Sequence, residues 1–261
     1  MTAHADRLWQ AMTTIDAQRV AGRDPVVILP LASVEQHGQH LPLSTDLDIA
    51  LGILDHALSV LPLDLPVYVL PAASVGASLE HARFPGTLSL DSDLLSRVIH
   101  AYGAAVSSAG AKRLVLFNSH GGNRHVLEQA ALRLRHECGL LVVQANYFLF
   151  PRPDDVALPE TEWLHAGAVE TAMMLHLQPH LVRAMEVRHG SIAGTIGKHR
   201  YVGADGVAPF AWLAGDLHPS GAIGDPSLAS AAFGRRLVEH YGQVLAEVIQ
   251  ETRVFPVDRL A

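Results

Sequence analysis

Four short apolar runs, the first three of them followed by a polar loop, limit what this chain can fold into more than any other feature. They occupy residues 26–31, 67–71, 114–117 and 140–145 and are rich in Val and Leu, and the continuous apolar run 26–31 is typical of a strand buried on both faces. Helical patterns separate them, and strands that alternate with helices at this spacing form βαβ units with parallel strands. The sequence therefore predicts an α/β fold with a largely parallel or mixed central sheet, covered by helices on both faces.

The predicted helices follow from apolar spacing and from capping residues. Leu47, Leu51, Leu54 and Leu58 repeat every three or four residues, so a helix begins near Asp46. Further helices are predicted over residues 91–108, 124–138, 165–177 and 226–250, with Asp225 as N-cap of the last, and before Pro25, with Leu8, Trp9 and Met12 on one face. A loop is predicted over 150–159, and 188–224 show too little periodicity to assign.

Composition and charge narrow the class of protein. The 261 residues are 49% hydrophobic, enough for a sizeable core, and we expect one domain over residues 1–261. The net charge is −7 and basic residues never cluster beyond a pair, which disfavours nucleic acid and anionic membranes as partners. Cys138 is the single cysteine, so a thiolate zinc site is excluded. A polar N-terminus and no apolar run near about 18 residues predict a soluble, cytoplasmic protein.

The loop of residues 32–46 holds four side chains of the kind that bind divalent metals: Glu35, His37, His40 and Asp46. Residues two apart in an extended segment point to opposite sides, which disfavours one metal shared by Glu35 and His37. If two metals are present, each residue can face one of them, and Asp46 is the natural bridge. The alternative is a solvated loop in which Asp46 only caps the following helix.

Two later segments add candidate donors. His120 follows the third apolar run, beside two glycines that let the backbone approach a ligand closely. The alternative there is an anion site at a helix start, but the residues of a phosphate-binding loop are missing. His165 and Glu170 are five residues apart, which excludes the i, i+4 pair of the helical zinc proteases. Glu170 can equally be a carboxylate near the positive end of a helix.

Five motifs give the chain a resemblance to a known family. They are Ser33-x-Glu35-Gln-His37-Gly-x-His40-Leu-Pro-Leu-x-Thr-Asp46, Phe84-Pro-Gly-Thr-Leu-Ser-Leu90, Asn118-x-His120-Gly-Gly-Asn123, His165-Ala-Gly-x-x-Glu170-Thr171 and Gly221-x-Ile-Gly-Asp225-Pro226. In this order, over residues 25–230, they resemble the creatininase (creatinine amidohydrolase) family. The resemblance implies a three-layer α/β/α amidohydrolase with two divalent metal ions, zinc or manganese and also iron, and often a homo-oligomer, a hexamer.

The resemblance also implies the metal ligands. Glu35 and His120 would hold one metal, His37 and Glu170 the other, and Asp46 would bridge them. Creatininase proper takes its last carboxylate from the histidine loop, where this chain has a glycine at position 122, and we therefore expect Glu170 to supply it. His40 drops out of the expected ligands, and we expect it to order the loop through a hydrogen bond.

Other residues bear on substrate and proton transfer. His165, with Glu170, is the expected catalytic group, because an imidazole titrates in the working range and can pass a proton to the leaving nitrogen. The expected substrate-binding residues are Ser78, Glu80, His81 and Trp163, although the first three can also serve loop hydrogen bonding. The chain departs from the family pattern at Gln39, Ser119 and Ala168, which leaves the expected metal site intact and the substrate open.

Three functions remain open from the sequence. The first, which we favour, is a small-molecule amidohydrolase that opens a cyclic amide or formamide C–N bond with water activated between two metals. The second is a peptidase of the same family that trims a ribosomal peptide in mycofactocin-type cofactor maturation. The third is a non-catalytic protein that binds a metal or a ligand. Metal-dependent turnover of any amide separates the third from the others.

Overall fold

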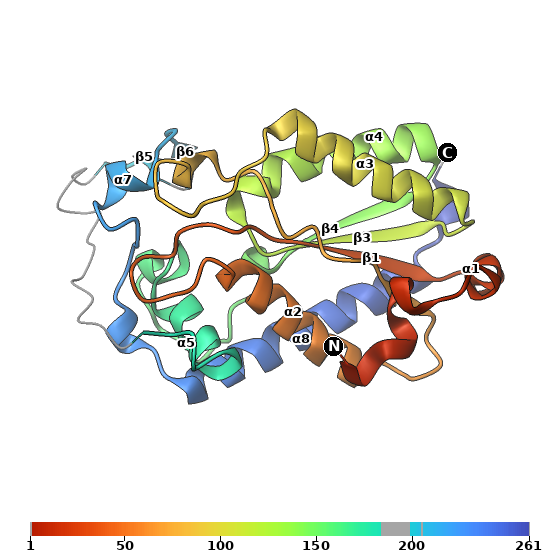
Figure 1. Ribbon diagram of the computed structural model, residues 1–261, viewed down its shortest axis with the longest axis horizontal. Helices are drawn as coiled ribbons and strands as arrows, with labels where there is room; N and C mark the ends of the chain where they lie inside the picture. Colours follow the sequence, from red (N-terminus) through yellow and green to blue (C-terminus); the bar gives the residue numbers. More distant parts are fainter. Residues whose placement is uncertain (1, 184–198, 205, 261) are drawn as a thin grey trace.

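A single parallel sheet lies at the centre of the computed structural model, which describes residues 2–183, 199–204 and 206–260. Its strands are β1 (Val26–Leu31), β2 (Val67–Val69), β3 (Arg113–Asn118) and β4 (Leu141–Asn146). They lie in the order β2-β1-β3-β4, and every neighbouring pair is parallel (Figure 1). The prediction of parallel strands is confirmed, and β1 has the bounds that the sequence indicated.

Helices cover both faces of the sheet (Figure 1). On one face lie α3 (Ser92–Ser108) and α4 (Arg124–Cys138), and on the other lie α2 (Thr45–Val60), α5 (Ala168–Leu177) and α8 (Ala231–Val254). Successive residues of β1 belong to different cores, because side chains alternate along a strand: Val27 packs with α3 and α4, Ile28 with α2 and α8. This arrangement is the predicted three-layer α/β/α fold.

Helix ends follow the capping chemistry in most places. Asp91 accepts a hydrogen bond from the Leu94 amide at the start of α3, and Gly139 ends α4 with φ of 68°. The prediction for the last helix is wrong at its start. Asp225 caps a single 3-10 turn (Pro226–Leu228), and Ser230 caps α8. The Asp225 amide is hydrogen-bonded to Glu162, so a tertiary contact sets the direction of the chain here.

The N-terminal segment also differs from the prediction. It forms 3-10 turns at Thr2–Arg7, Trp9–Ala11 and Ala21–Arg23 and the helix α1 (Thr14–Val20). Leu8 has extended backbone and pairs with Val69, the last residue of the edge strand β2, so strand pairing overrides the helical spacing. Residues 150–159 form a loop after the turn Tyr147–Leu149, as predicted.

Short elements complete the chain. They are 3-10 turns at Leu79–His81, Gly121–Asn123, Glu160–Trp163 and Val257–Arg259, the two-residue strands β5 (Val202–Gly203) and β6 (Ala208–Pro209), and the helix α7 (Ala214–Leu217). Part of the unassigned stretch, residues 188–198 and residue 205, lies outside the described residues. None of the helices in the described ranges is long and apolar enough to cross a bilayer.

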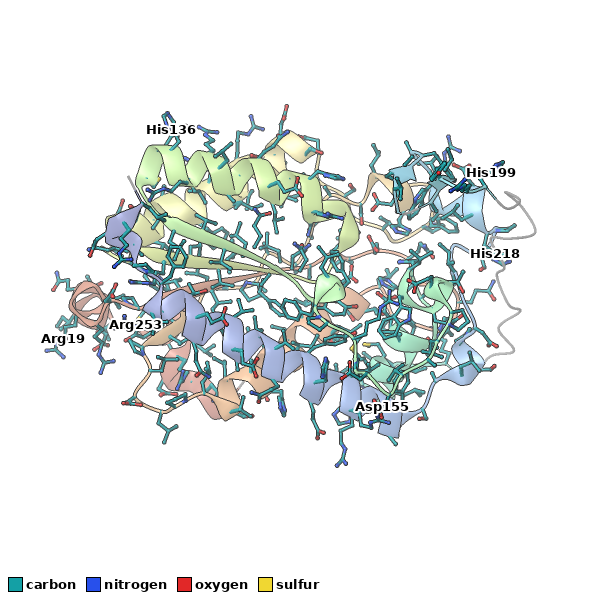
Figure 2. The ribbon with its side chains drawn as sticks, turned by 180° about the vertical axis from the view of Figure 1, so that it is seen from behind. Arg19, His136, Asp155, His199, His218 and Arg253 are labelled. Atoms are coloured by element: carbon teal, nitrogen blue, oxygen red, sulfur yellow. The ribbon has the colours of Figure 1, made fainter. Side chains whose placement is uncertain are left out.

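All four strands point to the same end of the molecule, the left end in Figure 1. The loops after β1, β2 and β3, the start of α5 and the turns around α7 gather there. Figure 2 shows His199 and His218 at this end, whereas Arg19 and Arg253 lie at the opposite end. Ligands of parallel α/β proteins bind beyond the carboxyl ends of the strands, so this end holds the candidate site.

Candidate metal centre

The loop after β1 sends Glu35 and His37 in different directions. Both side chains are buried, with 1% and 0% of their residue surface exposed. Glu35 Oε2 lies 3.3 Å from His120 Nδ1, whereas His37 Nε2 lies 3.8 Å from Glu170 Oε2. The two residues are adjacent to different partners, as expected for side chains two apart in extended backbone.

Asp46 lies between these two pairs. It sits in the first turn of α2 rather than at the N-cap, which is Ser44 and makes no side-chain cap. Its Oδ1 is 3.3 Å from His37 Nε2, and its Oδ2 is 3.3 Å from His120 Nδ1. The helix therefore holds one carboxylate with one oxygen toward each pair, and the reading of Asp46 as only a helix cap is wrong.

The donor atoms are close enough to share metal ions. Among the described residues, three groups have ligand atoms within 4.8 Å of one another: Glu35 with Asp46 and His120, His37 with Asp46 and Glu170, and Glu35 with His37 and His165. His37 Nε2 and Asp46 Oδ2 are buried and have no hydrogen-bond partner in the described part of the chain. Buried polar atoms are rarely left unpaired, and imidazole and carboxylate donors suit zinc or manganese, so these residues fit a divalent ion.

The electrostatics of the cluster favour added positive charge. Burial lowers the pKa of His37, but Asp46, Glu170 and Glu35 more than reverse this and raise it to about 10. Burial lowers the pKa of His120 too, and Glu35 and Asp46 hold it well above its usual range. Carboxylates that pull protons onto both imidazoles would stabilise a divalent cation in the same place.

Glu170 serves two partners in the first turn of α5. Its Oε2 accepts a hydrogen bond of 2.6 Å from the amide of Ala166, whose φ of 53° is in the left-handed region. The same carboxylate faces His37. Burial raises the pKa of Glu170, Asp46 adds to this, His37 opposes it, and the result is about 7. The carboxylate can therefore accept the Ala166 hydrogen bond at the start of the helix and still face His37 as a candidate metal ligand.

His40 lies outside the three groups formed by the described residues. Its Nε2 is 2.9 Å from the Thr171 hydroxyl, next to Glu170, and its main-chain oxygen accepts from the Arg183 amide. The hydrogen bond joins the first loop to α5. This is the loop-ordering role expected from the sequence.

His165 belongs to a stack of imidazoles beside Glu35. Its ring centroid is 4.3 Å from that of His37 and 4.2 Å from that of His81. His165 Nδ1 is 3.7 Å and His81 Nε2 is 3.4 Å from Glu35 Oε1. Burial lowers the pKa of His165 well below its usual range, and His37 and His81 add to this effect.

The residues expected to bind substrate divide into two kinds. Ser78 is fully buried and donates to the Glu35 carboxylate, and Glu80 Oε1 is 3.5 Å from His120 Nε2. These contacts, like that of His81, are with the candidate ligands. Trp163 is partly buried under the Arg152 guanidinium, 4.3 Å from the ring centroid, and its Nε1 has no hydrogen-bond partner among the described residues. Substrate contact by these side chains stays a prediction.

The structure adds two buried residues that the sequence reading missed. Gln36 contacts His81, His165 and the Gly221 carbonyl, and its only sequence signal was a place between two candidate ligands. Glu162 accepts from the amides of Ala168 and Asp225, which ties the start of α5 to the last loop. Its partner in the last loop is 63 residues away, so no local pattern reveals this role.

The chain is similar to known proteins in sequence and in fold. Residues 10–249 match the family model of creatinine amidohydrolase. The chain is 35% identical over 215 residues to the mycofactocin precursor peptide peptidase of Mycolicibacterium smegmatis, covering 82% of this chain and 79% of the relative. It is 30% identical over 182 residues to the creatinine amidohydrolase of Pseudomonas putida, covering 63% and 68%.

A solved structure of a mutant creatininase has the same fold. Its TM-score is 0.76, with 24% identity and coverage of 95% of this chain and 99% of the other. The family model matches most of the sequence, and the fold is similar to that of a solved creatininase. The chain belongs to the creatininase family of amidohydrolases.

Proposed function

We propose that this protein hydrolyses amide C–N bonds with two divalent metal ions, zinc, manganese or iron. The observation that carries the proposal is the position of Asp46, whose two oxygens lie 3.3 Å from His37 and 3.3 Å from His120. A carboxylate shared by two donor groups is the arrangement that a two-metal hydrolase needs.

In this proposal each metal position has three ligands. Glu35, His120 and Asp46 hold the first, and His37, Glu170 and Asp46 hold the second, which are two of the three donor groups in the described structure. When bound, such ions supply an activated water and polarise the substrate carbonyl. The burial of the ligands excludes bulk water and strengthens these interactions.

His165 is the proposed proton carrier. It lies within 3.7 Å of Glu35 and is not needed for either three-ligand set. Its lowered pKa leaves the imidazole neutral near pH 7, so a nitrogen lone pair can accept a proton and then release it to the leaving nitrogen. Glu170 takes part by holding the second ion and by fixing the Ala166 amide beside His165.

Two classes of amide are candidate substrates. The sequence motifs favoured a small cyclic amide or formamide, and the 30% identical Pseudomonas putida relative is a creatinine amidohydrolase. The relatives named mycofactocin precursor peptide peptidase are 33–35% identical and match 82–85% of this chain. This higher similarity favours a peptide, and we rank a short peptide above a small cyclic amide. A homo-oligomer, hexameric by family resemblance, and a cytoplasmic location stay predictions.

Metal removal and a substrate panel test the proposal. The protein is stripped with a chelator, reloaded with zinc or manganese, and analysed for metal content. Turnover of creatinine, formamidopyrimidines and short peptides is then measured by product chromatography. We expect about two ions per chain and activity that disappears on chelation and returns on reloading. Two bound ions without turnover of any amide would support a binding protein instead.

A further inference from the structure

Gln36, between the candidate ligands Glu35 and His37, is at the centre of a buried hydrogen-bond network. Its side chain is 4% exposed. Oε1 accepts a 2.9 Å hydrogen bond from the Gly38 amide. Nε2 lies 3.0 Å from the Gly221 carbonyl and 2.7 Å from His81 Nδ1. The amide therefore has a partner for its oxygen and one for each of its two hydrogens.

The orientation of the Gln36 amide follows from its partners. The Gly38 amide can only donate, and the Gly221 carbonyl can only accept. Exchanging the oxygen and the nitrogen would place two donors together at Gly38 and two acceptors together at Gly221. The amide is thus fixed with Nε2 toward His81 and Gly221.

This orientation determines the tautomer of His81. One Gln36 hydrogen goes to the Gly221 carbonyl, and the other goes to His81 Nδ1, which must accept. The proton of the neutral imidazole is then on Nε2, 3.4 Å from Glu35 Oε1. His81 offers an N–H to one Glu35 oxygen, and the other oxygen faces His120.

The main chain of the same residue determines the tautomer of His165. His165 Nε2 is 2.8 Å from the Gln36 carbonyl oxygen, which can only accept, so Nε2 carries the proton. Gln36 Nε2 also lies 3.0 Å from His165 Nε2, but both atoms are donors here. The Gln36 hydrogens go to His81 and Gly221, and the His165 hydrogen goes to the Gln36 carbonyl, so this contact is not a hydrogen bond. His165 Nδ1 keeps its lone pair and faces Glu35 Oε1 at 3.7 Å.

We propose that Gln36 is a positioning residue that sets both tautomers: its side chain makes His81 a donor to Glu35, and its carbonyl leaves His165 with an unprotonated Nδ1 beside the metal ligands. The inference rests on the proposed function only for the use of that Nδ1 as the proton-accepting atom. Gly221 is required for this hydrogen-bond network for two reasons. A Cβ at 221 would overlap Gln36 Oε1, and the φ of 78° favours glycine.

Nitrogen NMR tests the tautomers directly. Zinc-loaded protein is labelled with ¹⁵N-histidine, and signals are assigned by His81→Gln and His165→Gln. We expect single Nε2–H tautomers for both residues at neutral pH. In Gln36→Leu we expect His81 to lose its single tautomer and His165, which is held by the main chain, to keep it. An Nδ1–H signal from either residue in the wild type, or an unchanged His81 in the variant, overturns the proposal.

Gly221→Ala reaches the same network without changing residue 36. We expect the same change at His81 and, in both variants, two bound metals with kcat lowered by about 10²-fold, the usual range for general acid–base groups. Gln243→Leu, on the surface of α8, is the control and should leave both unchanged. If the His81 tautomer changes as expected in the variants but the wild type hydrolyses no amide, the proposed function is rejected and the positioning role of Gln36 stands. Loss of metal in both variants, with tautomers unchanged, would reject the positioning role.

Discussion

At Asp46 a single side chain serves both halves of the candidate metal centre. Its two oxygens lie 3.3 Å from two different imidazoles, and its helix is continuous with the loop that carries Glu35 and His37. We therefore expect removal of its charge to affect both proposed metal positions at once. The other candidate ligands form two pairs, one on each side of Asp46: Glu35 with His120, and His37 with Glu170.

Asp46→Asn keeps the size of the side chain and removes its charge. We expect the loss of both ions and an activity at least about 100-fold lower, because even residues that only orient ligands cost 10–100-fold. Metal analysis after dialysis and kcat/KM measure the two effects. Asp48→Asn is the matched control, since Asp48 lies on the same helix and accepts from the Ser44 hydroxyl at 2.7 Å. Retention of both ions in Asp46→Asn would contradict the bridging assignment.

Gly122 leaves room for the group that holds His120. A Cβ at this position would overlap the Ala77 carbonyl, the Glu80 carboxylate and His120 Nε2. His120 Nε2 is 3.0 Å from that carbonyl, so its Nδ1 is the nitrogen directed at Glu35 and Asp46. The histidine loop therefore cannot also supply a carboxylate from residue 122 without moving its own histidine.

Gly122→Ala should turn His120 away from the other ligands. We expect zinc affinity to fall about 10–100-fold, as for changes to groups that orient a ligand. Competition with a chromogenic chelator measures the affinity. Gly121→Ala is an adjacent control, because no described atom lies within 4 Å of a Cβ at 121. Equal affinities of the two variants would show that the Ala77 contact does not position His120.

Residue types in the sequence indicated candidate metal donors, and the family resemblance implied the set of five ligands, but neither indicated the groups around them. Glu35, His37 and Asp46 lie within twelve residues, so their chemistry is visible in one segment. Gln36 meets His81 across 45 residues, His165 across 129 and Gly221 across 185. Partners at such separations carry no local signal, and only the fold brings them together.

At the scale of elements, buried strands were predictable and helix starts were less so. The runs that became β1, β2 and β3 are apolar because both faces of the sheet are covered, which leaves a strong pattern in the sequence, whereas β4 at the edge of the sheet is only partly buried. The predictions of a helix through Leu8 and of a helix start at Asp225 were wrong because distant partners fix both residues: Val69 pairs with Leu8, and Glu162 accepts from the Asp225 amide. Long-range contacts, rather than propensity, decided both places.

The contact between α5 and α8 depends on Gly234. A Cβ at 234 would overlap the main chain of Ala172, in the helix that presents Glu170. Gly234→Ala should force the helices apart and lower the free energy of unfolding by about 1–3 kcal/mol, the usual cost of overpacking. Urea denaturation of the metal-free protein measures this. Gly215→Ala, with no described atom within 4 Å of the new Cβ, should have little effect; equal midpoints would argue against close helix contact.

At the scale of the whole molecule, the donor cluster couples stability to pH. Burial raises the pKa of Glu170 to about 7, above its ordinary 4.5, and the carboxylates raise that of His37 to about 10. Between the ordinary and the raised values the folded chain binds more protons than the unfolded chain. These two groups therefore contribute stability that is fully present below their windows and is lost as pH rises through them, whereas His40 and His81, whose pKa values are lowered to about 4, contribute stability that is lost as pH falls.

Bound metal should reverse that pH dependence. Ligands must be deprotonated to bind an ion, so metal binding releases protons and strengthens as pH rises. We expect the difference in Tm between zinc-loaded and metal-free protein to grow from pH 6 to pH 8, chiefly because the metal-free form weakens. Differential scanning fluorimetry in matched buffers measures it. A difference that is constant over this range would show that these groups do not bind the ion.

The two proposed metal positions are held by different groups, which predicts an order of loading. Glu35 and His120 follow β1 and β3, which are hydrogen-bonded neighbours, and the pKa of Glu35 is held well below its usual range by His120, His81 and His165 despite burial. Glu170 instead shares its oxygen with the Ala166 amide and must release a proton near neutral pH. Calorimetric titration with zinc should show a tight and a weaker step, and Glu170→Gln should remove only the weaker. In a cell with little free metal the protein would then hold one ion per chain, and the concentration of metal would limit its activity.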